Sequence, residues 1–88
     1  MKTVRPILYT KTGCPWCAEA REVLERQGIP YDERSVTTDA AAAAEMQRLS
    51  GQKKAPVLTW SGDVLADFGA SELEKFLTAR AVREKARP

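Results

Sequence analysis

The pattern of apolar and polar residues along the chain predicts four short strands. Residues 7–10, ILYT, are aromatic, aliphatic or β-branched and precede a turn-like Lys-Thr-Gly, so we expect a short buried strand there. Residues 31–36 alternate only weakly, as in a strand near the edge of a sheet. Residues 57–60 predict a third strand. A hairpin loop over residues 61–63 is expected to lead into a fourth, antiparallel strand that begins at residue 64.

Apolar residues at three- and four-residue steps predict three helices between and after these strands. The first begins near Pro15, which suits an opening helical turn, and ends at Gly28. The second begins after Asp39, an N-cap residue, and ends at Gly51. Ser71 and Glu74 match a capping box for the third. The expected inward faces are Ala20, Val23, Leu24 and Gln27 in the first helix, Ala42, Met46 and Leu49 in the second, and Leu73, Phe76, Leu77 and Ala81 in the third.

The resulting order, β-α-β-α-β-β-α, predicts most of the topology. Two strands joined through a helix are expected to be parallel, and two joined by a tight turn antiparallel. The sequence therefore predicts an α/β fold with a mixed four-stranded sheet flanked by three helices. Residues 1–88 suffice for one domain. Its basic helical C-terminal tail, from about residue 79 to 88, places cations at the negative end of a helix dipole.

Composition restricts the class of protein and its partners. Hydrophobic residues make up 43% of the 88 residues and charged residues 30%, which is ordinary for a soluble globular domain. The net charge of +2 is too small to suggest nucleic-acid binding. No apolar run approaches the roughly 20 residues of a membrane span, and no secretory signal is recognisable. We therefore expect a cytoplasmic protein without nucleic-acid or membrane partners.

Cys14 and Cys17 are the only cysteines in the chain. A structural disulfide is rare in the reducing cytoplasm, and a bridge between them would close too short a loop to constrain the unfolded chain much. Structural zinc requires four ligands, and one chain without histidine cannot supply them. We expect no metal. A homodimer that holds zinc or an iron–sulfur cluster between two pairs remains an alternative of another class, a binding module.

The position of the pair favours redox chemistry instead. Only a thiolate attacks a disulfide, and Cys14 lies where a strand ends and a helix begins. Free N–H groups and the helix dipole there, with Lys11 nearby, are expected to lower the pKa of Cys14 below that of a free thiol. Cys14 would then open a substrate disulfide, and Cys17, one turn further on, would displace the product. Pro15 shapes the turn, and an exposed Trp16 offers a flat docking surface.

The segment YTKTGCPWC before a helix, with APV some forty residues on and a hairpin into a final helix, resembles a glutaredoxin from about Ile7 to Leu77. The resemblance implies the thioredoxin fold. It also implies reduction of protein disulfides or glutathione mixed disulfides through Cys14 and Cys17, with glutathione as the co-substrate that recharges the pair. Expected partners are disulfide-containing or glutathionylated proteins and glutathione itself, and we expect a monomer.

The same resemblance suggests how glutathione would bind. In the family the peptide matching Ala55-Pro56 is cis, and the residue matching Ala55 pairs through its backbone with the cysteinyl part of glutathione. Lys11 matches a lysine that neutralises the glycine carboxylate, with Gln52, Lys53 or Lys54 beside the same groove. The expected glutathione-binding residues are Lys11, Pro15, Trp16, Lys54, Ala55, Pro56, Asp67, Gly69 and Ala70.

One segment departs from the family pattern. Where glutaredoxins commonly carry a glycine pair and then two acidic residues, this chain has Ala66 and Asp67 and then Gly69 and Ala70. Backbone N–H groups near Gly69, Ala70 and Ser71 are expected to bind the γ-glutamyl carboxylate, and Asp67 to meet its amino group.

A second interpretation is a redoxin that is recharged by thioredoxin reductase and donates electrons to ribonucleotide reductase, because such proteins also lack the acidic pair. They usually carry a different residue pair between the cysteines. Pro15-Trp16 therefore favours the glutathione-dependent class. The segment LADFGA does not distinguish the glutathione-dependent class from the class recharged by thioredoxin reductase.

Overall fold

The computed structural model describes residues 5–85 and has the predicted order of strands and helices. The elements are β1 (Ile7–Thr10), α1 (Pro15–Arg26), β2 (Asp32–Ser35), α2 (Ala40–Ser50), β3 (Val57–Trp60), β4 (Asp63–Ala66) and α3 (Ala70–Lys85). Residues 86–88 of the expected basic tail lie outside the described residues. Within the described part of the chain, no helix is both long enough and apolar enough to cross a bilayer.

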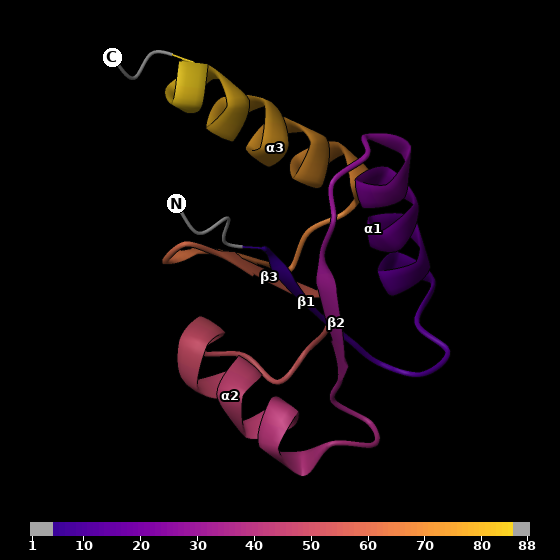
Figure 1. The fold of residues 1–88 in the computed structure, drawn as a ribbon. Helices are drawn as coiled ribbons and strands as arrows, with labels where there is room; N and C mark the ends of the chain where they lie inside the picture. The colour runs from indigo at the N-terminus through magenta and orange to yellow at the C-terminus, as the bar shows by residue number, and fades with distance from the viewer. Residues whose placement is uncertain (1–4, 86–88) are drawn as a thin grey trace.

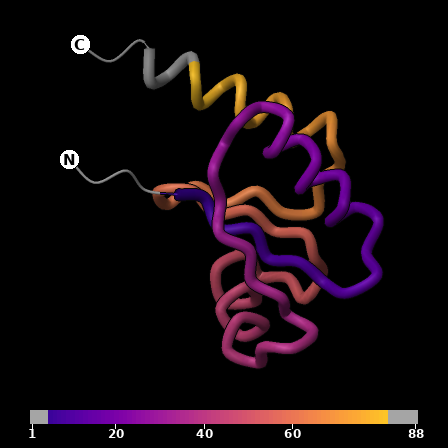
Figure 2. Tube along the Cα trace, turned by 45° about the vertical axis from the view of Figure 1, so that its right-hand side comes forward, coloured from indigo at the N-terminus to yellow at the C-terminus, as the bar shows by residue number. Residues whose placement is uncertain are grey.

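The four strands form one mixed sheet in the order β2-β1-β3-β4. β1 is parallel to β2 and antiparallel to β3, and β4 is antiparallel to β3. Helices α1 and α3 cover one face of the sheet and α2 covers the other (Figure 1), and the turned view in Figure 2 shows the same two layers around the strands. The predicted mixed sheet is confirmed, and β2 is an edge strand as its weak alternation suggested.

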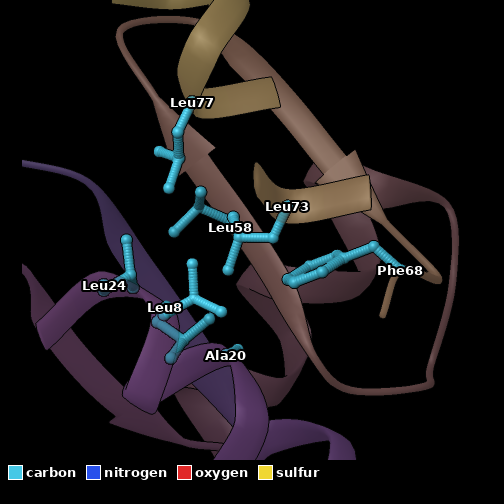
Figure 3. Packing of buried hydrophobic residues seen from close by; sticks show 8 residues of the cluster. Leu8, Ala20, Leu24, Leu58, Phe68, Leu73 and Leu77 are labelled. Atoms are coloured by element: carbon cyan, nitrogen blue, oxygen red, sulfur yellow. The ribbon is translucent and has the colours of Figure 1, made fainter. Parts of the chain in front are cut away.

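Alternating residues of the central strands divide the core into two clusters. Leu8 and Leu58 face α1 and α3, whereas Tyr9 and Val57 face α2. The larger cluster has leucines from both strands and both helices pointing toward one another, with Phe68 at one end (Figure 3). Because successive side chains of a strand point to opposite faces, each central strand is buried on both sides. The loop that carries Cys14 therefore follows a central strand that is buried on both faces of the sheet.

The inward face of α2 differs from the prediction at its last turn. Ala42 and Met46 are buried as expected, but Leu49 is 44% exposed. The next residue, Ser50, is partly buried instead, and its hydroxyl donates to the carbonyl of Met46 at 2.6 Å. Two further expected inward residues, Gln27 after the end of α1 and Ala81 on α3, are exposed as well.

The predicted capping box at the start of α3 is wrong by two residues. The helix begins at Ala70, so Ser71 already lies inside it, and Glu74 pairs with Arg26 of α1 at 2.8 Å. Instead, the N–H of Gly69 donates to Oε1 of Glu72 at 2.9 Å, which is the same three-residue spacing. Burial of Phe68 in the core places the entry to the helix earlier than the serine suggested.

The β3–β4 hairpin is one residue tighter than predicted. Asp63 pairs with Trp60 in the strand ladder and belongs to β4, which leaves Ser61 and Gly62 as a two-residue loop. Both have positive φ, 50° and 90°, as hairpin turns of this length require.

Candidate functional site

Cys14 lies at the junction between β1 and α1, as the N-cap of that helix. Its backbone is extended, and its Sγ accepts a hydrogen bond from the N–H of Cys17 at 3.3 Å. Pro15 occupies the first helical position, where the missing N–H leaves no bond unmade. The sulfur of Cys14 therefore lies at the positive end of a helix, with an N–H directed at it, and both features favour a negative charge.

Cys17 lies one turn further into α1 and is fully buried, whereas Cys14 is partly exposed. Burial is the main reason that the pKa of Cys17 rises to about 11, and the hydrogen bond with Cys14 adds to the rise. The backbone N–H of Lys11 donates to the Cys17 sulfur at 3.4 Å, and this bond lowers the pKa and so offsets part of the rise. Cys17 is therefore held as a neutral thiol at pH 7.

A hollow of about 370 Å³ opens beside Cys14, and three lysines line it. Lys11 comes from the loop after β1, and Lys53 and Lys54 from the loop before β3, so both loops contribute positive charge. Trp16, 57% exposed, forms part of the same wall. An anionic ligand would be attracted to this side of the reactive sulfur.

A second hollow of similar volume continues from the first and has the opposite charge. The two share Trp16 and Ala55, and the second is also lined by Pro56, Asp67, Phe68, Gly69 and Glu72. The peptide between Ala55 and Pro56 is cis, as the resemblance implied. We call the two hollows together the groove. It has a lysine end beside Cys14 and an acidic end beside the start of α3.

Comparison with known proteins assigns the chain to a family. The family model that matches residues 7–65 is described as glutaredoxin. The chain belongs to the glutaredoxin family. This is a family of thiol-disulfide oxidoreductases, and the chain has its redox-active pair in Cys14 and Cys17.

Two curated relatives of this glutaredoxin-family chain illustrate the similarity. A glutaredoxin of Neisseria meningitidis is 44% identical over 57 residues, 64% of this chain and 65% of that protein. A glutaredoxin-like 8.6 kDa protein from the rubredoxin operon of Clostridium pasteurianum is 30% identical over 70 residues, 80% of this chain and 93% of the relative.

Solved structures support the thioredoxin-like fold of this glutaredoxin-family chain. The thioredoxin-like protein BC3987 is 28% identical with a TM-score of 0.74, and the match covers 81% of this chain and 97% of the other. A buckwheat glutaredoxin, solved in complex with glutathione, shares the fold at 19% identity with a TM-score of 0.69, over 91% of this chain and 74% of that protein.

The groove brings together all of the predicted glutathione-binding residues except Ala70, which lies in the first turn of α3 but does not line either hollow. Phe68 and Glu72 line the groove and were not predicted. The three-residue spacing from Gly69 to Glu72 is typical of a capping box, and this pattern could have identified Glu72 from the sequence. The N–H of Gly69, expected to bind a ligand carboxylate, already donates to Glu72.

A metal site requires several ligating side chains in one place. Within residues 5–85, no three or more cysteine, histidine or acidic side chains are grouped so that they could hold a metal ion. A cluster shared between two copies of this glutaredoxin-family chain would need ligands from both, and stays a hypothesis.

Proposed function

We propose that the protein is a dithiol glutaredoxin of the Cys-Pro-Trp-Cys type, which reduces protein disulfides or glutathione mixed disulfides with electrons from glutathione. The observation that carries the proposal is the contrast within the pair. Cys14 is partly exposed and accepts an N–H bond at a helix start, whereas Cys17 is buried and protonated behind it. The Cys14 sulfur can thus reach and attack a substrate, and the Cys17 thiol reacts only in a later step.

In the first step the thiolate of Cys14 attacks one sulfur of the substrate disulfide. That disulfide bond breaks as a bond between Cys14 and the substrate forms, and the departing sulfur leaves as a thiolate that takes a proton from solvent. The N–H of Cys17 and the dipole of α1 stabilise the attacking anion. Trp16, exposed next to Cys14, provides an apolar surface on which the substrate rests.

Cys17 acts in the second step when the substrate is a protein disulfide. With a pKa of about 11, about one Cys17 in ten thousand is ionised at pH 7, so it must lose its proton as it attacks. The departing substrate thiolate takes up that proton. Cys17 bonds to Cys14, the mixed disulfide breaks, and two electrons have moved from the pair to the substrate.

Glutathione restores the dithiol in two exchanges. The thiolate of one glutathione attacks Cys14 and releases Cys17, and a second glutathione attacks the resulting mixed disulfide and leaves as glutathione disulfide. When the substrate is itself a glutathione mixed disulfide, only the second exchange is needed. Lys11, Lys53 and Lys54 attract the glycine carboxylate, and the backbone of Ala55 pairs with the cysteinyl part. These steps suit a reducing compartment, and we place the activity in the cytoplasm.

A redoxin recharged by thioredoxin reductase is the second candidate. The observations in its favour are at the acidic end of the groove. Gly69 and Ala70 stand where glutaredoxins commonly have two acidic residues. The Gly69 N–H, which could have bound a glutathione carboxylate, donates to Glu72 instead. A chain that binds glutathione weakly would need another electron source.

A comparison of two reductases separates these candidates. The protein is given a disulfide substrate with NADPH and either glutathione plus glutathione reductase or thioredoxin reductase alone. We expect NADPH oxidation in the first mixture. Turnover in the second mixture alone would reject the proposal in favour of the second candidate.

Two cysteine variants test the division of roles within the pair. Cys14→Ser should abolish reduction of every substrate, because it removes the attacking sulfur. Cys17→Ser should retain reduction of glutathione mixed disulfides, which requires one thiol, and lose reduction of protein disulfides. The same loss in both variants on both substrates would contradict the assigned roles.

A further inference from the structure

The acidic end of the groove contains a carboxylate of the protein itself at the start of α3. Oε1 of Glu72 accepts the Gly69 N–H at 2.9 Å, and this bond is the main reason that the pKa of Glu72 is lowered, with its own backbone N–H as the second cause. The side chain is fully exposed and therefore ionised at neutral pH. The N–H of Gly69, just before α3, and the N–H of Glu72 itself thus both favour the negative charge of this carboxylate.

Gly69 allows this close approach. A Cβ at position 69 would lie 3.1 Å from Oε1 of Glu72, so a side chain there would push the carboxylate back by a few tenths of an ångström. The same Cβ position is 3.9 Å from Cζ3 of Trp16, so Gly69 lies close both to the Glu72 carboxylate and to the tryptophan that lines both hollows. Glu72 is therefore close to any ligand that extends from Cys14 past Trp16.

Asp67 is a second acidic residue in the lining of the same hollow, and Trp16 is an exposed aromatic residue there. A ligand carboxylate that entered here would meet two negative charges and would have to displace Glu72 from the Gly69 N–H. An ammonium or guanidinium group would instead meet two carboxylates beside an aromatic ring, which is a favourable setting for a cation.

We propose that Glu72 determines the substrate specificity of the groove. It takes the place of a ligand carboxylate at the start of α3 and, with Asp67, selects disulfides in which the peptide that becomes bonded to Cys14 carries a cationic group at this end. The preferred substrates are disulfides of peptides or proteins with a lysine, an arginine or a free amino group beside the reacting cysteine, and a carboxylate toward Lys11, Lys53 and Lys54. The inference rests on the proposed function, because it concerns the substrate of the same site.

Three S-methylated tripeptides test the proposal without any disulfide exchange. They are S-methylglutathione, its analogue without the γ-glutamyl carboxylate, and its analogue without the γ-glutamyl amino group. Calorimetry gives their affinities for the reduced full-length protein. We expect the carboxylate-free analogue to bind about two- to fivefold more tightly than S-methylglutathione, which is the size of the effect of one charged group near a helix end. The amine-free analogue should bind most weakly of the three.

Glu72→Gln keeps the shape of the side chain and removes its charge. It should weaken the carboxylate-free analogue and strengthen the amine-free analogue, each by about two- to fivefold. Glu72→Ala, which also frees the Gly69 N–H, should strengthen the amine-free analogue further. Glu74→Gln is the matched control, because it removes the same charge from α3 at a residue that pairs with Arg26.

Equal affinities of the three ligands for the wild-type protein, or the same shifts in Glu74→Gln, would overturn the role of Glu72. Because the ligands are unreactive, this result is independent of turnover. The expected order of affinities together with no disulfide reduction in either reductase mixture would reject the proposed function and leave the role of Glu72 in place.

Discussion

Raising the pH should destabilise the protein through Cys17 in a way that can be isolated. The side chain is fully buried, and burial is the largest cause of the rise in its pKa from about 9 to about 11. The folded protein therefore keeps this proton at pH values where the unfolded chain has lost it. A buried thiolate is costly, and the attraction of Arg21 is weaker than the effect of burial, so folding resists the ionisation.

The sign and size of the effect follow from the two pKa values. Well below pH 9 the thiol is protonated in both states and the stabilisation is fully present. Between pH 9 and pH 11 unfolding releases a proton, so the free energy of unfolding falls as the pH rises. A shift of about two units corresponds to about 2.7 kcal/mol in total, of which about 2 kcal/mol is lost by pH 10.5.

Urea denaturation under reducing conditions, from pH 7 to pH 10.5, measures this loss in the wild-type protein and in Cys17→Ala. We expect the wild-type protein to lose about 2 kcal/mol more than the variant. Tyr9 and Tyr31, whose pKa values are raised to about 12 chiefly by burial, are present in both proteins, so their contributions cancel in the difference. Parallel pH dependences in the two proteins would refute the reasoning and place Cys17 in contact with solvent.

Three further substitutions probe the lysine end of the groove, the core and a helix cap. Lys11→Ala should raise KM for a glutathionylated peptide by about two- to fivefold and lower kcat less, since the backbone N–H that donates to Cys17 remains; an unchanged KM would remove Lys11 from the site. Leu58→Ala, at a fully buried position between both helices, should lower the free energy of unfolding by about 2–5 kcal/mol in urea; a loss below 1 kcal/mol would contradict the packing. Asp39→Ala should cost about 1 kcal/mol, because its carboxylate accepts N–H bonds from Ala41 and Ala42 at the start of α2, whereas the exposed Asp32→Ala should cost much less.

Features that depend on neighbouring residues could be predicted from the sequence. Asp39 caps α2 as expected, and Gly51 ends it with a φ of +73°, a conformation that favours glycine. Pro15 begins α1 and places Cys14 at its N-cap. In each case the interacting groups lie within a few residues of one another, so the chemistry of the side chain decides the local structure with little help from the rest of the fold.

Features that depend on distant segments were harder to predict. Ser71 and Glu74 have the spacing of a capping box, but the burial of Phe68 moves the helix start and gives that role to Glu72. Leu49 has a suitable period, yet it is exposed and the next residue, Ser50, is partly buried instead. The acidic end of the groove forms only when α1 and the segment before α3 come together, and no local pattern specifies that meeting. The cis peptide before Pro56 was expected from the family resemblance alone.

The edge position of β2 has a consequence for how copies of this protein behave when crowded. Three consecutive charged residues, Asp32, Glu33 and Arg34, form most of that strand, and Arg21 and Arg5 pair with two of them. Joining two such edges into one continuous sheet would strip water from these charged side chains and disturb their existing ion pairs. The strand thus disfavours fibril growth along this side, although no other strand of the described residues pairs with its outer edge.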